Sequence, residues 1–279
     1  MDWDPNFLAR SPIFEPLNTH LTGSWPARWP GLPLLQGLLD RRVPPVCVAS
    51  GMPLRLVPQA VKRGRAELRY EERTYQRAEL QVRPNNWHDL FNVLVWLTFP
   101  QAKAALNARH HAAASGREPR ATSNRGPAED ALTLFDEGGV IVTATSRELL
   151  ELLREHEWKE LFWRRRGAVV EEMRFYLFGH ALYEKALRPF TGITGRGLCF
   201  DVGGDFMQAP APVRLAELDE RVAARIRAPE RFAATRDLAH VPILGVPGWC
   251  ADNETASYYD NIDYFRPRPR RANHHTPRG

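Results

Sequence analysis

The stretch NWHDLFNVLVWLTFP, residues 86–100, gives the clearest structural signal in the sequence. Asn86 is a good N-cap residue, and Asp89, three positions later, places a carboxylate at the positive end of a helix dipole. The later turns are almost entirely apolar, which is not the pattern of a surface helix. We therefore expect a helix that runs to about Phe99. Pro100 is well placed to open a second helix, which is rich in alanine and covers residues 101–114.

The rest of the sequence predicts more helices and a few short strands. Four further helices are expected, over residues 127–135, 145–165, 168–187 and 214–227. The second of these rests on Thr145 and Glu148, which have the spacing of a capping box. Extended or strand-like segments are expected over residues 44–48, 54–57, 140–143, 196–206 and 241–249. Residues 67–75 fit an edge strand and a helix equally well.

The predicted fold class is helix-rich α+β, with several packed helices and a few short, antiparallel strands. A chain of 279 residues is long enough to bury a sizeable core, and we expect one globular domain over residues 1–263. The proline-rich residues 1–66 are expected to wrap irregularly over a main body at residues 67–263. A mobile loop is expected over residues 116–126, and a disordered tail rich in arginine and proline over residues 264–279.

The basic excess of the sequence lies at its end. The chain has 38 Lys+Arg and 33 Asp+Glu, and residues 264–279 contain five arginines and no acidic residue. The remainder is therefore formally neutral. Nucleic acid or another anionic partner is expected only at this tail or at the arginine-containing loop 116–126.

The cysteines and the apolar segments indicate the compartment. The three cysteines, Cys47, Cys199 and Cys250, form no C-x-x-C pair, which argues against a disulfide framework and a cysteine zinc site. The first residues do not resemble a secretory signal. The longest apolar stretch, residues 91–99, is about half of the ~20 residues that a membrane-spanning helix needs. We expect a soluble, cytoplasmic protein that does not contact a membrane.

His180 and Glu184 are the most interesting polar pair. Their i,i+4 spacing places both inside the apolar stripe of the expected helix 168–187. A hydrogen bond between them would hold the imidazole in one tautomer and raise its basicity, which suits a general base or a metal ligand. The alternative is an ion pair that only fixes packing in the core.

A second polar group, His88, Asp89 and Asn92, begins the helix that starts after Asn86. These side chains either line a cleft at the helix N-terminus, where the dipole favours an anion, or cap an exposed end. For Asp89 alone, capping is the better interpretation.

A third polar group, Lys103, Asn107 and His110, shares one face of the following helix, with His111 beside it. This stripe faces either solvent or a site, and a solvated face is the usual outcome.

Two acidic pairs, Glu129-Asp130 and Asp136-Glu137, could supply carboxylates for acid–base work or for a divalent cation. Their simpler interpretation is a first helical turn for the former and a chain reversal for the latter. The H-E-x-x-H, G-x-G-x-x-G, P-loop and G-x-S-x-G motifs are all absent. Zincins, dinucleotide enzymes, P-loop NTPases and α/β-hydrolases are therefore disfavoured, and no nucleotide cofactor is expected.

Taken together, the motifs resemble a bacterial family known as domain of unknown function 3025. The resemblance covers most of residues 40–267. It implies that members of this family are relatives of the chain, but it implies no reaction. It rests on residues 86–92, 96–100, 130–137, 178–181, 244–249 and 259–260, with Lys103, Leu106, Asn107, His110, Glu184 and Lys185.

Two functions remain open at this point. The first is an enzyme, hydrolase-like, that uses acid–base or metal-assisted chemistry, with a divalent metal compatible with the ligand types. Its candidate catalytic residues are His88, Asp89, His110, His180 and Glu184. Its candidate substrate-binding residues are Asn92, Lys103, Asn107, Asp130 and Asp136. The alternative is a non-catalytic binding or scaffold protein whose basic tail contacts nucleic acid or another anionic partner. The enzyme hypothesis requires these side chains to meet at one pocket.

Overall fold

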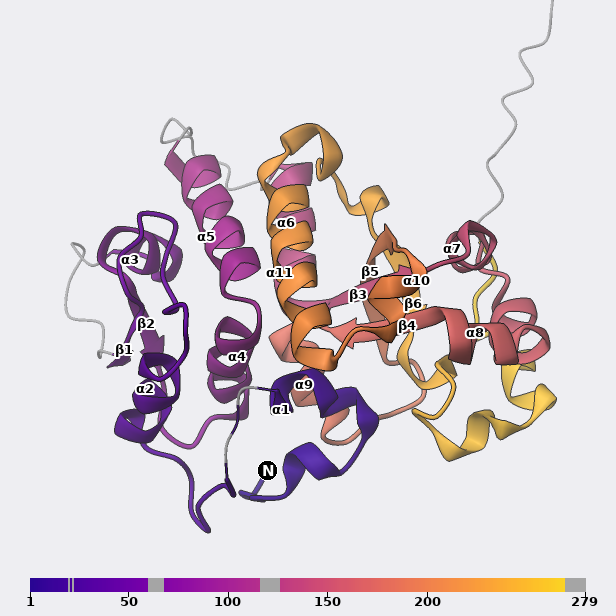
Figure 1. Cartoon of the computed structure of the whole chain (residues 1–279), viewed down its shortest axis with the longest axis horizontal. Helices are drawn as coiled ribbons and strands as arrows, with labels where there is room; N and C mark the ends of the chain where they lie inside the picture. Colours follow the sequence, from indigo (N-terminus) through magenta and orange to yellow (C-terminus); the bar gives the residue numbers. More distant parts are fainter. Residues whose placement is uncertain (20, 22, 60–67, 116–125, 269–279) are drawn as a thin grey trace, which may run out of the picture.

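The computed structural model describes residues 1–19, 21, 23–59, 68–115 and 126–268. Two expected segments lie outside the described residues: the loop 116–126, apart from Gly126, and the end of the arginine-rich tail, residues 269–279. The contact with an anionic partner was expected at these two segments. The helices are α1 Glu15–Asn18, α2 Leu32–Asp40, α3 Tyr70–Arg77, α4 Trp87–Thr98, α5 Pro100–Ser115, α6 Pro127–Gly138, α7 Arg147–Arg154, α8 Arg166–Glu172, α9 His180–Ala186, α10 Gly204–Gln208 and α11 Ala211–Arg227 (Figure 1). The strands are β1 Arg55–Pro58, β2 Glu79–Val82, β3 Gly139–Ala144, β4 Met173–Leu177, β5 Thr194–Asp201 and β6 Ala239–Pro242.

The helix-rich α+β class predicted from the sequence is confirmed, but the strand directions are mixed. β1 and β2 form a small parallel sheet. The second sheet has the order β4-β3-β5-β6, in which β3 and β5 are parallel and the two outer pairs are antiparallel. The expectation of antiparallel strands was wrong for the two parallel pairs. α3 separates β1 from β2 in the chain, and several helices separate β3 from β5, which gives the crossovers that parallel pairing needs.

Helix α4 lies at the centre of the described structure, as its apolar sequence predicts. From Leu90 to Thr98 every side chain is buried. Asn86 caps the helix, because its side-chain oxygen accepts a hydrogen bond from the backbone N–H of Asp89 at 3.0 Å. The helix packs against α9, and α5 continues from it to pack along α11 (Figure 1).

The amino-terminal segment is attached to α4 through aromatic rings. Trp3 stacks on Trp87 with ring centroids 5.2 Å apart, and Trp29 meets Trp87 edge-on at 4.8 Å. Phe7 is fully buried and contacts the same cluster. The regular helices α1 and α2 fall within residues 1–66, for which the sequence predicted irregular structure.

The single helix predicted over residues 168–187 was wrong. The chain forms α8, then strand β4, then α9. Residues 173–177 pair antiparallel with β3, so that Tyr176 lies opposite Ile141. A run of large apolar side chains satisfies either a buried helix or a buried strand, and here pairing with β3 decides between them.

Gly179 lies between β4 and α9, as the N-cap residue of α9, at a point where two backbones almost touch. A Cβ atom at Gly179 would lie 2.5 Å from the carbonyl oxygen of Glu137 and from the backbone nitrogens of Gly138 and Gly139. Only glycine fits this approach. It presses the first turn of α9 against the last turn of α6.

Other predicted boundaries also moved. Helix α6 continues to Gly138, so Asp136 and Glu137 are helical and do not lie in a turn. Helix α7 ends at Arg154, and the hydroxyl of Thr145 does not cap it but donates to Glu172 across 3.3 Å. The expected helix of residues 214–227 begins earlier, at Ala211.

The expected tail does not start at residue 264. Tyr264 and Phe265 are buried, with 6% and 4% exposure. The hydroxyl of Tyr264 accepts a hydrogen bond from the Leu244 N–H and donates one to the Ile193 carbonyl. Packing of these two aromatic rings therefore holds the chain beyond the predicted boundary.

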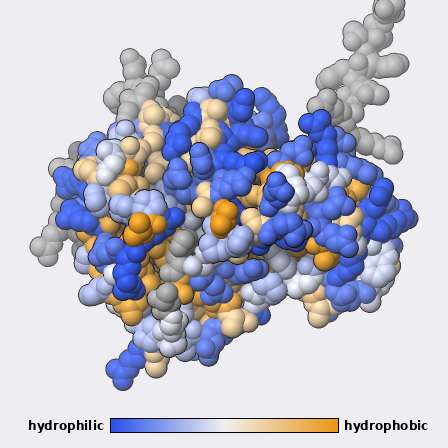
Figure 2. Space-filling model, in the orientation of Figure 1, coloured by the Kyte–Doolittle hydropathy of each residue, from blue (hydrophilic) through white to orange (hydrophobic). Residues whose placement is uncertain are grey.

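The surface seen in Figure 2 is mostly hydrophilic, with apolar residues in small separate patches. Among the described helices, none has the length and apolar character that crossing a membrane requires.

Helix α5 is capped by a side chain from another helix. Asp219 of α11 is 1% exposed, and its carboxylate accepts hydrogen bonds from the N–H groups of Gln101 and Ala102, at 3.0 and 2.8 Å. Burial raises the pKa of Asp219 to about 6, while the two N–H groups oppose that rise. The carboxylate therefore remains ionised at pH 8 and makes charge-assisted bonds to the helix end.

Asp219→Ala should lower the free energy of unfolding by about 2–4 kcal/mol, because it leaves the first N–H groups of α5 without acceptors. Urea denaturation at pH 8 measures the change. Glu220→Ala, an exposed neighbour on the same helix, is the matched control and should stay within about 0.5 kcal/mol of the wild type. Equal effects of the two substitutions would contradict a capping role for Asp219.

Candidate metal centre

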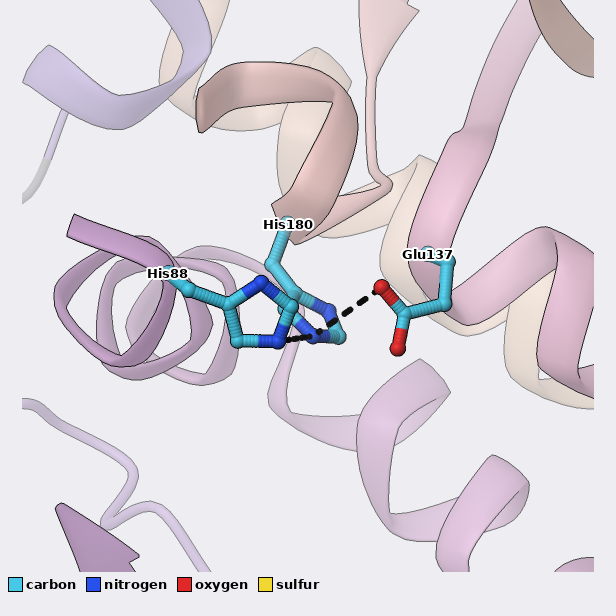
Figure 3. A group of neighbouring side chains, drawn as sticks. All are labelled: His88, Glu137 and His180. Atoms are coloured by element: carbon cyan, nitrogen blue, oxygen red, sulfur yellow. Dashed lines mark hydrogen bonds and ion pairs between the residues drawn. The ribbon is translucent and has the colours of Figure 1, made fainter. Parts of the chain in front are cut away.

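Three side chains from three helices meet at one point (Figure 3). His88 comes from the first turn of α4, Glu137 from the last turn of α6, and His180 from the start of α9. The Asn86 cap fixes where α4 begins, and the close approach at Gly179 fixes His180 beside the end of α6. The residues lie far apart in the sequence, so the fold alone brings them together.

The two imidazoles face each other through their Nε2 atoms, which are 3.0 Å apart. Oε2 of Glu137 lies 3.7 Å from Nε2 of His180. One ligand atom of each residue, two nitrogens and one oxygen, can be chosen so that all lie within 4.8 Å of one another. His180 is only 4% exposed, whereas the side chains of His88 and Glu137 are 29% and 45% exposed. The group is thus buried on one side and open on the other.

The opposite nitrogen of each ring is also engaged. Nδ1 of His180 lies 2.8 Å from the backbone carbonyl oxygen of Asp136, and Nδ1 of His88 lies 3.2 Å from Oε2 of Glu184. A carbonyl oxygen can only accept, so Nδ1 of His180 carries the hydrogen. Burial lowers the pKa of His180 to about 3, with nearby Lys103 and His88 acting in the same direction against Asp136. His180 is therefore neutral, and its Nε2 presents a lone pair.

The predicted hydrogen bond between His180 and Glu184 was wrong. Their i,i+4 spacing is real, but the helix starts at His180, and Glu184 reaches across to His88 on α4 instead. Each histidine still has an oxygen acceptor on Nδ1, which is the arrangement that fixes the tautomer of metal-ligating histidines.

An ion pair lies directly behind the histidines. Nζ of Lys103, which is 4% exposed, lies 2.5 Å from Oδ1 of Asp136. Burial alone would raise the pKa of Asp136, but the charge of Lys103 and its hydrogen bond outweigh it and lower that pKa below its usual value. For Glu137, burial and the charge of Asp136 raise the pKa. Lys103 lies against Asp136 and not against Glu137, so the pKa values of the two carboxyl groups shift in opposite directions.

The open side of the group leads into a cavity of about 310 Å³. Asp89 lies in its wall and forms a two-point ion pair with the Arg83 guanidinium, at 2.7 and 2.8 Å. Asn92 also lies in the wall and donates to the hydroxyl of Tyr70 at 2.6 Å. The lining residues are Gln59, Tyr70, Glu71, Gln81, Arg83, His88, Asp89, Asn92, Asp136, Glu137 and His180. Every one of them is polar or carries a polar group.

A smaller cavity adjoins the first through Tyr70, Glu71 and Asp136. Lys103, Asn107 and His110, the predicted stripe on α5, all line it. Asn107 is 3% exposed and donates to the carboxylate and the carbonyl of Glu71, at 2.7 and 2.9 Å. The stripe therefore faces the interior and is not a solvated surface.

Most of the predicted candidates thus converge. His88, Asp89, Asn92, Asp136 and His180 line the larger cavity, Glu184 bonds His88, and the α5 stripe lies behind Asp136. Asp130 does not join them, because it is exposed at the first turn of α6 and lines neither cavity. The sequence offered Glu137 only as one of an acidic pair with Asp136, and Glu137 was not among the candidate residues. Tyr70, Glu71 and Arg83 had no signal in the sequence pattern.

Comparison with known families agrees with the motif pattern. The profile described as "Protein of unknown function (DUF3025)" matches residues 54–270. The chain belongs to the DUF3025 family. The resemblance predicted from the sequence is confirmed, and the matched segment contains every residue of the candidate metal centre. Searches of curated proteins and of solved structures give no match.

Lys103→Met should destabilise the protein by about 3–5 kcal/mol at neutral pH, because it leaves the Asp136 carboxylate without its cation. The folded-state pKa of Asp136 is lowered, so the stability that this pair provides is fully present above the ordinary Asp pKa. That stability is lost as the pH falls below the ordinary pKa and through the lower folded-state pKa. The difference between wild type and variant should therefore narrow below about pH 4. Urea denaturation at several pH values measures both effects.

Lys159→Met is the matched control for that experiment. Lys159 pairs with Asp260 at the surface, where the two side chains are 38% and 59% exposed, and its loss should cost under about 1 kcal/mol. If the two lysine variants lose equal stability, Lys103 does not neutralise a buried charge.

Proposed function

We propose that this protein is a divalent-metal-dependent enzyme of hydrolase type. Nε2 of His88, Nε2 of His180 and the Glu137 carboxylate hold the metal. The observation that supports this most is the pair of Nε2 atoms at 3.0 Å, each on a ring whose Nδ1 already contacts an oxygen acceptor. Two lone pairs at that separation repel unless a proton or a metal ion lies between them.

The ligand set has a recognised chemistry. Two histidines and one carboxylate bind Zn²⁺ in hydrolytic sites and Fe²⁺ in other enzymes, and they leave coordination positions open. A metal held this way supplies a bound water that ionises near neutral pH, or polarises a substrate carbonyl. The open positions would face the 310 Å³ cavity, because Glu137 and His88 are partly exposed there.

The surrounding residues would orient the ligands. Glu184 holds the His88 ring, and the Asp136 carbonyl holds the His180 ring. Lys103 keeps the Asp136 carboxylate paired behind the site, which leaves that group unavailable as a competing ligand. Fixed rings lower the cost of ordering the ligands when the metal binds.

The cavity wall favours a hydrophilic substrate that is not strongly anionic. Among its carboxylates, Asp89 is paired with Arg83 and Asp136 with Lys103, and Glu137 would hold the metal, which leaves Glu71 without a cation among the described residues. A phosphate group would meet this carboxylate, whereas an uncharged polar group or an amine would not be repelled by it. Tyr70, Gln59 and Gln81 supply further groups for hydrogen bonds.

Isothermal titration of chelator-treated protein with Zn²⁺ and with Mn²⁺ tests the metal site. We expect one site per chain for at least one of the two ions, and binding at least about 100-fold weaker after His88→Ala, His180→Ala or Glu137→Gln. His110→Ala and Asp130→Asn are matched controls, because they remove a histidine and a carboxylate outside the ligand set. The proposal fails if the wild type binds neither ion tighter than about 100 µM, or if the ligand variants bind as the controls do.

Catalysis needs a separate measurement, because metal binding alone would also suit a structural site. The metal-loaded protein should hydrolyse members of a panel of chromogenic ester, amide and glycoside substrates. Activity should disappear with the chelator and in the His180→Ala variant, and should return when the metal is restored to the wild type only. One bound metal without activity on any class would argue for a structural or binding role.

Glu184→Gln should weaken metal binding by about 10–100-fold without abolishing it, because the amide holds the His88 ring less strongly than a carboxylate does. The same titration measures the change. Glu171→Gln, which alters an exposed acid on α8, should leave the affinity unchanged. An affinity that is the same in wild type and Glu184→Gln would show that Glu184 does not support the His88 ligand.

A further inference from the structure

A second large cavity, of about 430 Å³, lies far from the candidate metal centre and shares no residue with its pocket. It lies at the edge of the four-stranded sheet. Residues of β5 and β6 form one side of it, and the loop after α7 and the last described residues form the rest. In Figure 1 these elements occupy the opposite end of the long axis from α3 and β1. The lining residues are His156, Trp158, Gly192, Thr194, Arg196, His240, Pro242, Asp263, Tyr264, Arg266 and Pro267.

Arg196 is the central cation of this cavity. It lies directly opposite His240 in the β5–β6 register, and its Nη1 is 2.9 Å from Nε2 of His240. Since a guanidinium only donates, His240 accepts this bond and is neutral. Burial, together with Arg196 and His156, lowers the pKa of His240 to about 4.

The charge of Arg196 is not compensated by the described part of the chain. The residue is partly buried, and among the described residues no carboxylate lies within ion-pair distance of it. Burial lowers its pKa, with no opposing contribution from an acid. A partly desolvated cation without a counter-charge costs stability. Such a cost is expected where a ligand later supplies the opposite charge.

Arg266 supplies a second guanidinium to the same cavity. Its Nε donates to the backbone carbonyl of Asp263, and among the described residues no carboxylate pairs with it either. Asp263 is the single acidic residue in the lining, whereas Arg268 close by is neutralised by Glu155. The indole N–H of Trp158 donates to the Arg266 carbonyl at 2.8 Å and so fixes this segment at the cavity wall.

One wall of the cavity is aromatic. The ring of His156 stacks on Trp158 with centroids 4.8 Å apart and an interplanar angle of 26°. His156 adopts a left-handed backbone conformation, φ 61°, and its ring meets His240 edge-on at 5.1 Å. The volume exceeds what a lone phosphate ion needs and lies in the range of cavities that take organic ligands.

We propose that this cavity binds a small organic anion whose phosphate or carboxylate group is held by the Arg196 and Arg266 guanidinium groups. Two planar guanidinium groups suit the oxygens of such a group. The remainder of the ligand lies against the wall formed by His156 and Trp158. The proposal is independent of the metal centre, where the charge of the wall favours the opposite kind of ligand.

Isothermal titration of the full-length protein with AMP and with inorganic phosphate tests this, with a chelator present so that no metal contributes. AMP should bind in the submillimolar range, more tightly than phosphate, and less tightly as the salt concentration rises. Arg196→Gln and Arg266→Gln should each weaken AMP binding by at least about 10-fold. Arg77→Gln, an exposed arginine on α3 at the other end of the molecule, is the matched control and should change the affinity by less than about twofold.

Thermal unfolding without ligand separates binding from a structural role. Because Arg196 is an uncompensated cation, Arg196→Gln should leave Tm unchanged or raise it. The proposal is overturned if AMP and phosphate both bind more weakly than about 10 mM, or if the two variants bind AMP as Arg77→Gln does. It is also overturned if Arg196→Gln lowers Tm strongly, because the guanidinium would then stabilise the pairing of β5 with β6. Tight binding of a single-stranded oligonucleotide with no binding of AMP would replace the small anion by a nucleic acid.

Discussion

The close approach of two backbones at Gly179 is the constraint on which the candidate site depends. No side chain can be added there without displacing the end of α6, and the contact fixes the first turn of α9 against the last turn of α6. His180 follows Gly179 and therefore reaches the Asp136 carbonyl, while Glu137 on the same turn faces the opposite nitrogen of the same ring. His88 lies in the first turn of α4, and the Asn86 cap fixes where that turn begins. Two local features, the contact at Gly179 and the Asn86 cap, thus produce a cluster whose members lie at positions 88, 137 and 180 of the sequence.

The buried polar residues around this cluster cost stability. Lys103, Asn92, Asn107 and His180 are all nearly buried, in a region where α4 and α5 otherwise present apolar side chains. Buried polar groups are tolerated when they are paired, and here the nitrogen of each has a partner: Asp136, Tyr70, Glu71 and the Asp136 carbonyl in turn. The Oδ1 atoms of Asn92 and Asn107 have no hydrogen-bond partner among the described residues. A hydrophobic core would be simpler to build and at least as stable. The retention of a connected polar network beside an open cavity indicates that the network positions groups for binding or chemistry.

The sequence predicted the parts of this fold that depend on local signals. The α4 cap, the α4–α5 junction at Pro100, the β3 strand and the helix-rich class follow from N-cap chemistry, proline placement and apolar periodicity. The division of residues 168–187 could not be predicted, because residues 173–177 are compatible with a helix until β3 is present to pair with them. That error also gave Glu184 the wrong partner. Glu137 was interpreted as part of a chain reversal for a related reason: with α6 predicted to end at Phe135, it fell in a turn, whereas the helix continues and places Glu137 beside His180.

The charge around the two imidazoles bears on whether a proton or the proposed metal ion lies between them. Asp136, Glu137 and Glu184 place three carboxylates beside the rings, Lys103 pairs with Asp136, and Lys185 is near enough to lower the pKa of Glu137. The carboxylates outnumber these cations, which favours a further cation at this point, and the proposed metal ion carries more charge than a proton. Burial lowers the pKa of His180 to about 3, so a proton on that ring is disfavoured. Glu137, whose pKa is raised by burial and by its acidic neighbour, places an oxygen 3.7 Å from Nε2 of His180. The proposed divalent metal would satisfy both lone pairs and that carboxylate at once, which is why the geometry and the charge favour the same ligand set.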